Sequence, residues 1–167
     1  MKTVFASILF SISLIGVSQP ILLDSAETKY FAELGFEIDS TSNYKLFDFV
    51  CQWTETPYKY AGKSLSGVDC SSFAKALHWE VYNIRLLGNS TALPSECMPV
   101  EQNELKQGDL IFFNIYGAKI SHVGVYLGDN KFVHASTKLG VTINDLSEKY
   151  YAKRYFSAGR VVILVDK

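Results

Sequence analysis

The chain of 167 residues is poor in cysteine, carries no excess of one charge, and has no long apolar run beyond its first residues. Three cysteines are too few for a disulfide scaffold, and the odd number leaves at least one thiol free or paired with another chain. The 16 basic and 17 acidic residues nearly cancel and form no long run of one sign. This balance argues against a surface that neutralises nucleic-acid phosphates.

Apolar and aromatic residues are plentiful. Hydrophobic residues make up 48% of the chain and aromatic residues 14%, which is enough to fill a core and excludes a disordered chain. The length fits one globular domain. No internal repeat or low-complexity tract divides it.

The first residues have the pattern of a secretory signal peptide. Lys2 precedes an apolar stretch over residues 4–17, and Gly16-Val17-Ser18 offers small residues for cleavage. We therefore expect residues 1–18 to be removed and the protein to be exported to the periplasm or secreted, with no stable membrane insertion afterwards. No cysteine follows the apolar stretch, so a lipid anchor is not indicated. The alternative is a buried N-terminal helix.

The rest of the chain changes from helical to strand-like patterns. Residues 19–43 are expected to form an N-terminal extension with a short helix over 27–34. Apolar residues at helical spacing predict one helix over 44–55, ended by Thr56-Pro57, and a second helix capped by Asp69. Apolar runs then predict strands at 110–113, 122–127, 132–135 and 161–165. Helices followed by antiparallel strands indicate an α+β domain over 44–166.

One cysteine and two histidines have the spacing of a nucleophilic site. Cys70 lies at the predicted start of a helix, where the partial positive charge favours thiolate over thiol. His122 and His134 flank the turn residues Gly128-Asp129-Asn130, so a hairpin would bring them near each other. A turn centred on Gly128 would place them directly opposite, whereas a two-residue turn at Asp129-Asn130 would need a bulge to restore their phase.

If the three residues meet, His122 acts as base toward Cys70 while His134 orients the ring of His122. The plainer interpretation is an inert buried cysteine and two satisfied strand histidines. Sequence spacing alone leaves both interpretations open.

Five segments, in this order and spacing, resemble the NlpC/P60 family of cysteine peptidases. They are residues 56–62 (TPYKYAG), 67–73 (GVDCSSF), 108–113 (GDLIFF), 121–129 (SHVGVYLGD) and 132–136 (FVHAS). The resemblance covers about residues 44–166. It implies a reduced papain-like fold, in which a nucleophile helix packs on an antiparallel sheet. It also implies cleavage of bacterial cell-wall peptides, typically at the γ-D-glutamyl bond to a diamino acid such as meso-diaminopimelate.

The resemblance assigns Cys70 as nucleophile, His122 as base and His134 as the third polar residue of a triad. It implies neither a metal nor a cofactor. The expected partner is peptidoglycan or a muropeptide, not nucleic acid, and the protein is expected to be a monomer.

Three further positions match the family's substrate cleft. Tyr58 matches a tyrosine that faces the nucleophile and helps to stabilise the oxyanion, and Asp69 and Ser71 match residues that line the cleft. Departures from the family pattern at Ala61 and Ser72 concern substrate preference rather than reaction type.

Several alternatives stay open at this stage. Cys70, His122 and His134 could bind zinc, although the short spacings typical of zinc motifs are missing. The fold could also serve an acyltransferase or a wall-binding protein that no longer catalyses. A Cys51–Cys97 disulfide is compatible with an oxidising compartment, but the sequence does not fix the distance between the two residues.

Overall fold

The computed structural model describes residues 25–36, 38 and 42–162. The predicted signal peptide over residues 1–18 lies outside this part of the chain. The elements, in chain order, are α1 (Ser25–Glu33), α2 (Tyr44–Trp53), β1 (Lys63–Ser64), β2 (Gly67–Val68), α3 (Cys70–Tyr82), the 3-10 helix η1 (Leu93–Glu96), β3 (Cys97–Val100), the 3-10 helix η2 (Gln102–Glu104), β4 (Leu110–Phe113), β5 (His122–Gly128), β6 (Lys131–Ser136), β7 (Gly140–Asp145), α4 (Lys149–Ala152) and β8 (Tyr155–Val161).

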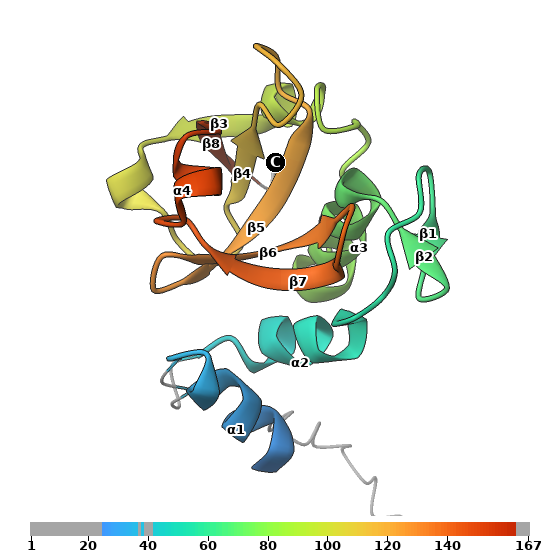
Figure 1. The fold of residues 1–167 in the computed structure, drawn as a ribbon, viewed down its shortest axis with the longest axis vertical. Coiled ribbons are helices and arrows are strands. Elements are labelled where there is room, and N and C mark those ends of the chain that lie inside the picture. Colours follow the sequence, from blue (N-terminus) through green and yellow to red (C-terminus); the bar gives the residue numbers. More distant parts are fainter. Residues whose placement is uncertain (1–24, 37, 39–41, 163–167) are drawn as a thin grey trace, which may run out of the picture.

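A six-stranded antiparallel sheet forms the centre of the domain, in the order β3-β8-β4-β5-β6-β7. Helix α3 packs against β5 and β6, and α2 packs against α3 (Figure 1). The predicted α+β class, with a helix that begins at Cys70 packed on an antiparallel sheet, is confirmed. The helix and the two histidine-bearing strands are therefore direct neighbours.

Alternating side chains of the central strands fill two hydrophobic clusters. On β4, Leu110 and Phe112 join the main cluster with α2 and α3, whereas Ile111 and Phe113 join a smaller cluster with Tyr151 of α4. This is the period of two that a strand buried on both faces requires. The sheet thus separates the α3 side of the domain from the α4 side.

Helix α1 shares the main cluster. The ring of Phe31 is fully buried and lies with its centroid 4.7 Å from that of Phe47 on α2 and 5.8 Å from that of Phe36. Figure 1 shows α2 between α1 and the rest of the domain. The described part of the predicted N-terminal extension is therefore packed onto the domain as an additional helical layer.

Some predicted boundaries are wrong. The last strand, predicted over 161–165, runs over Tyr155–Val161 instead, and residues 163–165 lie outside the described part. Ser157, Gly159 and Arg160 interrupt its apolar pattern, so no sequence signal predicted a strand that pairs with both β3 and β4. Strands β3 and β7 are edge strands. All residues of β3, and all of β7 except Gly140 and Val141, are exposed or half-buried, so neither strand has the apolar run that would have predicted it.

The helix predicted over 44–55 ends earlier, at Trp53. The hydroxyl of Thr54 donates to the carbonyl of Val50 at 2.8 Å, and Glu55 has a φ of 66°, so the chain leaves the helix before Thr56-Pro57. No disulfide joins Cys51 and Cys97, so the bridge that the sequence allowed is absent. Among the helices described, none has the length and apolar character to cross a bilayer.

Candidate active site

Helix α3 begins at Cys70, as its sequence predicts. The carboxylate Oδ1 of Asp69 accepts a hydrogen bond from the backbone N–H of Ser72 at 2.7 Å and another from the hydroxyl of Ser71 at 2.9 Å. This cap satisfies a backbone donor that every helix N-terminus otherwise leaves without a partner. Asp69 therefore fixes the first turn of the helix and, with it, the position of Cys70.

The Cys70 thiol is buried, with 8% of the residue exposed. Burial raises the pKa of this thiol, and a hydrogen bond from the backbone N–H of Val123 opposes the rise. The lost hydration outweighs the positive end of the helix, so the thiol is favoured instead of the thiolate that the helix position alone indicated. Val123 directly follows His122, so the sulfur lies at the start of β5. No hydrogen bond joins the sulfur to either imidazole in the described structure.

The turn between β5 and β6 brings the two histidines to the same face. The chain turns at Asp129-Asn130, where both residues have positive φ, and a bulge lies between Tyr126 and Gly128. Without the bulge, this two-residue turn would place His122 and His134 on opposite faces of the sheet. The bulge therefore restores their phase, which was one of the two arrangements expected from the sequence.

The imidazoles of His122 and His134 are joined directly. Nε2 of His122 lies 2.7 Å from Nδ1 of His134, and the two residues are 7% and 2% exposed. Burial, with a smaller contribution from its histidine neighbour, lowers the pKa of His122 to about 3. Burial also lowers the pKa of His134 to about 4, although its bond to Asn144 works against this. Both rings are therefore neutral near pH 7.

Three further residues, next to His134 in space, determine which tautomer the two imidazoles adopt. Glu148 Oε1 can only accept, so the Asn144 atom 2.9 Å from it is the amide nitrogen. The amide oxygen of Asn144 then faces Nε2 of His134 at 2.9 Å, with the Tyr151 hydroxyl 3.1 Å from the same nitrogen. Nε2 of His134 must carry the proton, and its Nδ1 accepts from Nε2 of His122. This leaves Nδ1 of His122 as an unprotonated nitrogen.

None of these three residues was expected from the sequence. Asn144 lies on β7, Glu148 immediately precedes α4, and Tyr151 lies within α4. One local signal was present: Glu148 stands three residues after Asp145 and accepts its backbone N–H at 2.9 Å, an arrangement typical of helix starts. That signal predicts a turn of helix but not a contact with His134, which depends on the pairing of β6 with β7.

The predicted cleft residues lie close to α3. Tyr58 is half-buried and bridges to Val68. Its pKa is raised mainly by burial, with smaller contributions from Cys70 and Asp69, so its hydroxyl belongs to the surroundings of the thiol. Ser71 is buried and its hydroxyl is bound to Asp69. Asp69 and Ser71 thus stabilise the helix start.

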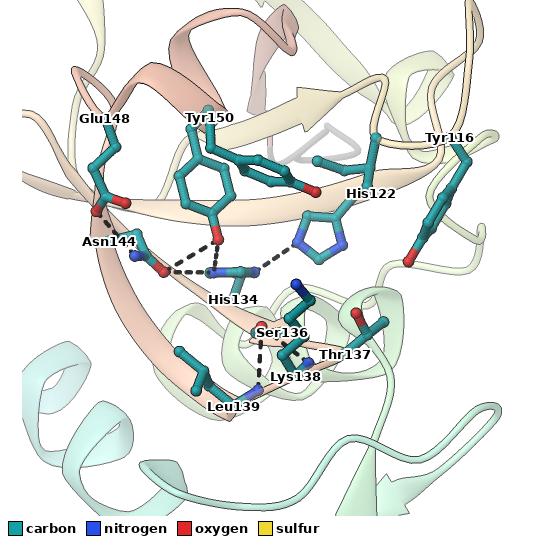
Figure 2. Close-up of a pocket in the computed structure, with 12 residues that line it drawn as sticks. Tyr116, His122, His134, Ser136, Thr137, Lys138, Leu139, Asn144, Glu148 and Tyr150 are labelled. Atoms are coloured by element: carbon teal, nitrogen blue, oxygen red, sulfur yellow. Dashed lines mark hydrogen bonds between the residues drawn. The ribbon is translucent and has the colours of Figure 1, made fainter.

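A pocket of about 290 Å³ opens beside the two imidazoles, on the side of β6, β7 and α4 (Figure 2). Its wall contains His122 and His134 together with aromatic, hydroxyl and charged side chains. Its lining residues are Ile115, Tyr116, His122, His134, Ser136, Thr137, Lys138, Leu139, Asn144, Glu148, Tyr150 and Tyr151. Cys70 and Tyr58 are outside this lining, so the pocket extends away from the thiol, past the imidazoles.

The same geometry bears on the zinc alternative. Nitrogen atoms of His122 and His134 point at each other across a hydrogen bond rather than toward a common third atom. Within the described residues, no three histidine, cysteine or acidic side chains are grouped as metal ligands. The arrangement is that of a hydrogen-bonded pair.

Comparison with known proteins gives consistent results. The family model described as "NlpC/P60 family" matches residues 55–160. A probable endopeptidase NlpC homolog of Haemophilus influenzae is 40% identical over 111 residues, which cover 66% of this chain and 58% of the relative. The murein DD-endopeptidase MepS/murein LD-carboxypeptidase of Escherichia coli K12 is 35% identical over 118 residues, covering 71% and 62%. The aligned region thus spans about three fifths of these relatives.

Solved structures show the same fold. An NlpC/P60 family protein from Bacillus cereus has a TM-score of 0.65 and 27% identity, covering 75% of this chain and 42% of the other. The NlpC/p60 domain of the peptidoglycan hydrolase SagA has a TM-score of 0.60 and 23% identity, and 99% of that chain is covered. The family model spans more than half of the sequence, from before the Cys70 helix to the last strand. The chain therefore belongs to the NlpC/P60 family.

Proposed function

We propose that this protein is a cysteine endopeptidase that hydrolyses the stem peptides of peptidoglycan, with Cys70 as nucleophile, His122 as base and His134 as the residue that orients it. The observation that carries the proposal is the hydrogen-bonded imidazole pair, whose tautomer leaves Nδ1 of His122 unprotonated at the strand start that abuts Cys70. Membership of a family whose relatives are named as murein endopeptidases supports the substrate class.

The first step starts from neutral groups. Because burial raises the pKa of the thiol and lowers that of His122, the resting pair is thiol and imidazole. As the sulfur attacks the peptide carbonyl, Nδ1 of His122 takes the thiol proton. The backbone N–H of Cys70 and the hydroxyl of Tyr58 stabilise the oxyanion. Loss of one such donor typically costs about 2.7–4 kcal/mol in the barrier.

The second step returns the proton. The His122 imidazolium donates it to the leaving amine, the C–N bond breaks, and an acyl-thioester of Cys70 remains. His122 then takes a proton from water, whose oxygen attacks the thioester and releases the acid and the thiol. His134 accepts the Nε2–H of His122 throughout and so keeps the reactive nitrogen turned to the substrate.

The bond proposed for cleavage is the γ-D-glutamyl bond to a diamino acid, above all meso-diaminopimelate, as the motif resemblance implies. A second candidate is the D,D cross-link between two stem peptides, because a relative with 35% identity is named a DD-endopeptidase. Both bonds lie outside the cytoplasm, which agrees with the proposed signal peptide over residues 1–18 and with export.

Mass spectrometry of products from defined muropeptides tests the function. Stem peptides with and without a cross-link are incubated with the wild type, with Cys70→Ala and with the control Cys97→Ala. We expect cleavage by the wild type and the control and none by Cys70→Ala, and the new termini identify the bond. Full activity of Cys70→Ala refutes the nucleophile. Muropeptide binding by the wild type without any product would indicate a wall-binding protein instead.

A further inference from the structure

The pocket beside the imidazoles lies on one defined side of the reacting atoms. His122 and His134 form part of its wall, whereas Cys70 and Tyr58 do not. In the proposed reaction the acyl half of the substrate becomes attached to Cys70, and His122 delivers a proton to the leaving amine. The amine half must therefore start at the ring of His122. The adjoining pocket, of about 290 Å³, is placed to receive it.

The two charged side chains in this lining, Glu148 and Lys138, differ in their hydrogen bonds. Glu148 uses Oε1 to accept from the amide of Asn144 and from the backbone N–H of Asp145, each at 2.9 Å. Lys138 is exposed, its side chain points toward the two imidazoles, and its ammonium group makes no hydrogen bond or ion pair among the described residues (Figure 2). The pocket thus presents an uncommitted cation beside two neutral rings.

The backbone holds Lys138 in this place. The hydroxyl of Ser136, at the end of β6, accepts from the backbone N–H groups of Lys138 and Leu139 at 3.3 and 3.4 Å. The chain then returns into β7 through Gly140, whose φ is 76° and where a Cβ would lie 2.3 Å from the carbonyl oxygen of Thr56. The turn that carries Lys138 is therefore fixed at both ends.

We propose that this pocket binds the residue on the amine side of the cleaved bond, and that Lys138 selects a residue with a free carboxylate there. The inference rests on the proposed function. In both candidate bonds the leaving amine belongs to the diamino acid. Meso-diaminopimelate differs from L-lysine by one carboxylate at the far end of the side chain. An ammonium–carboxylate contact supplies the discrimination between the two.

The test compares two soluble muropeptides of each candidate linkage that are identical except for meso-diaminopimelate or L-lysine at the diamino position. The wild type is expected to show a kcat/KM about tenfold or more higher for the diaminopimelate substrate, the range of a hydrogen bond between charged groups. Lys138→Gln should bring this ratio close to one, because it lowers kcat/KM for the diaminopimelate substrate much more than for the lysine substrate. Lys153→Gln, the same change at an exposed lysine outside the pocket lining, should keep the wild-type ratio.

The outcomes separate the two proposals. A Lys138→Gln variant that retains the wild-type preference, or a wild type with no preference, overturns the role of Lys138 while the peptidase assignment stands. Equal loss of activity on both substrates assigns Lys138 to a general structural role and also overturns the proposal. If the wild type cleaves neither substrate of either linkage, the proposed function itself fails.

Discussion

At the scale of single residues, the chemistry depends on which nitrogen carries a proton. Glu148 orients the amide of Asn144, that amide fixes the protonated nitrogen of His134, and His134 then fixes that of His122. The sequence identified both histidines because each lies in a recognisable strand. It could not identify Asn144, since a polar residue in an edge strand has many ordinary reasons to be there. It could not identify Glu148 either, because the contact of Glu148 with Asn144 exists only in the folded chain.

Replacement of Asn144 should impair turnover rather than binding. Asn144→Ala removes the oxygen that holds Nε2–H of His134, so both tautomers become populated and fewer molecules have an unprotonated Nδ1 on His122. We expect kcat to fall about 10- to 100-fold, by analogy with the loss of a partner that orients a metal-bound histidine, with KM little changed. Nitrogen-15 NMR of the imidazoles should report mixed tautomers. Asn103→Ala, at an exposed site in η2, serves as the control, and an unchanged kcat in Asn144→Ala would contradict the orienting role.

The resting state of Cys70 should be visible in its reactivity. Since burial raises the pKa of this thiol, its alkylation rate should stay low near pH 7 and rise only above the ordinary cysteine range. Iodoacetamide labelling followed by site-resolved mass spectrometry gives the rate for each cysteine across pH. A titration of Cys70 with a midpoint below pH 7 would show a preformed thiolate and would contradict the neutral resting pair.

At the scale of elements, the bulged β5–β6 turn positions the two histidines, and the capped start of α3 positions Cys70. The sequence indicated both: Asp69 precedes a helical apolar pattern, and Gly128-Asp129-Asn130 marks the turn. It could not decide the register, because a turn centred on Gly128 and a bulged turn at Asp129-Asn130 satisfy the same pattern. The bulge became evident only from the strand pairing.

The cap of α3 can be tested separately from chemistry. Asp69→Ala leaves the N–H of Ser72 without its 2.7 Å partner and should lower the free energy of unfolding by about 1 kcal/mol. Asp69→Asn keeps an oxygen acceptor and should stay within a few tenths of a kcal/mol of the wild type. Urea denaturation of both variants measures the difference. Equal stability of Asp69→Ala and Asp69→Asn would mean that the cap does not hold the helix start.

At the scale of the whole molecule, the described segments share one main core. Phe31 of α1, Phe73 of α3 and Val133 of β6 belong to the same buried cluster. The sequence predicted the fold class because helical and strand-like patterns occupy different halves of the chain. It placed residues 19–43 in an extension, since a short helix gives no sign of what it packs against. The aromatic contacts of Phe31 reveal that partner.

The two neutral imidazoles are buried against the smaller cluster, beside Phe113, Phe132 and Tyr151, and their burial makes global stability depend on pH. The pKa values of His122 and His134 fall to about 3 and about 4 in the folded protein, against about 6.5 in an unfolded chain. As the pH falls below about 6.5, these histidines bind protons in the unfolded state but not in the folded state. The free energy of unfolding present at pH 7 is therefore progressively lost. At pH 5 the loss is about 2 kcal/mol for each ring.

Urea unfolding at pH 7, 6 and 5 measures this loss, in a window above the ordinary carboxylate pKa values. The wild type should be several kcal/mol less stable at pH 5 than at pH 7. His134→Gln removes one of the titrating rings. Between pH 7 and pH 5 this variant should therefore lose about 2 kcal/mol less unfolding free energy than the wild type. His78, also buried with a lowered pKa, remains in both proteins and adds the same slope to each. Equal slopes for the wild type and His134→Gln would mean that His134 titrates alike in the folded and unfolded chains, and the neutral hydrogen-bonded pair that supplies the base to Cys70 would then not exist.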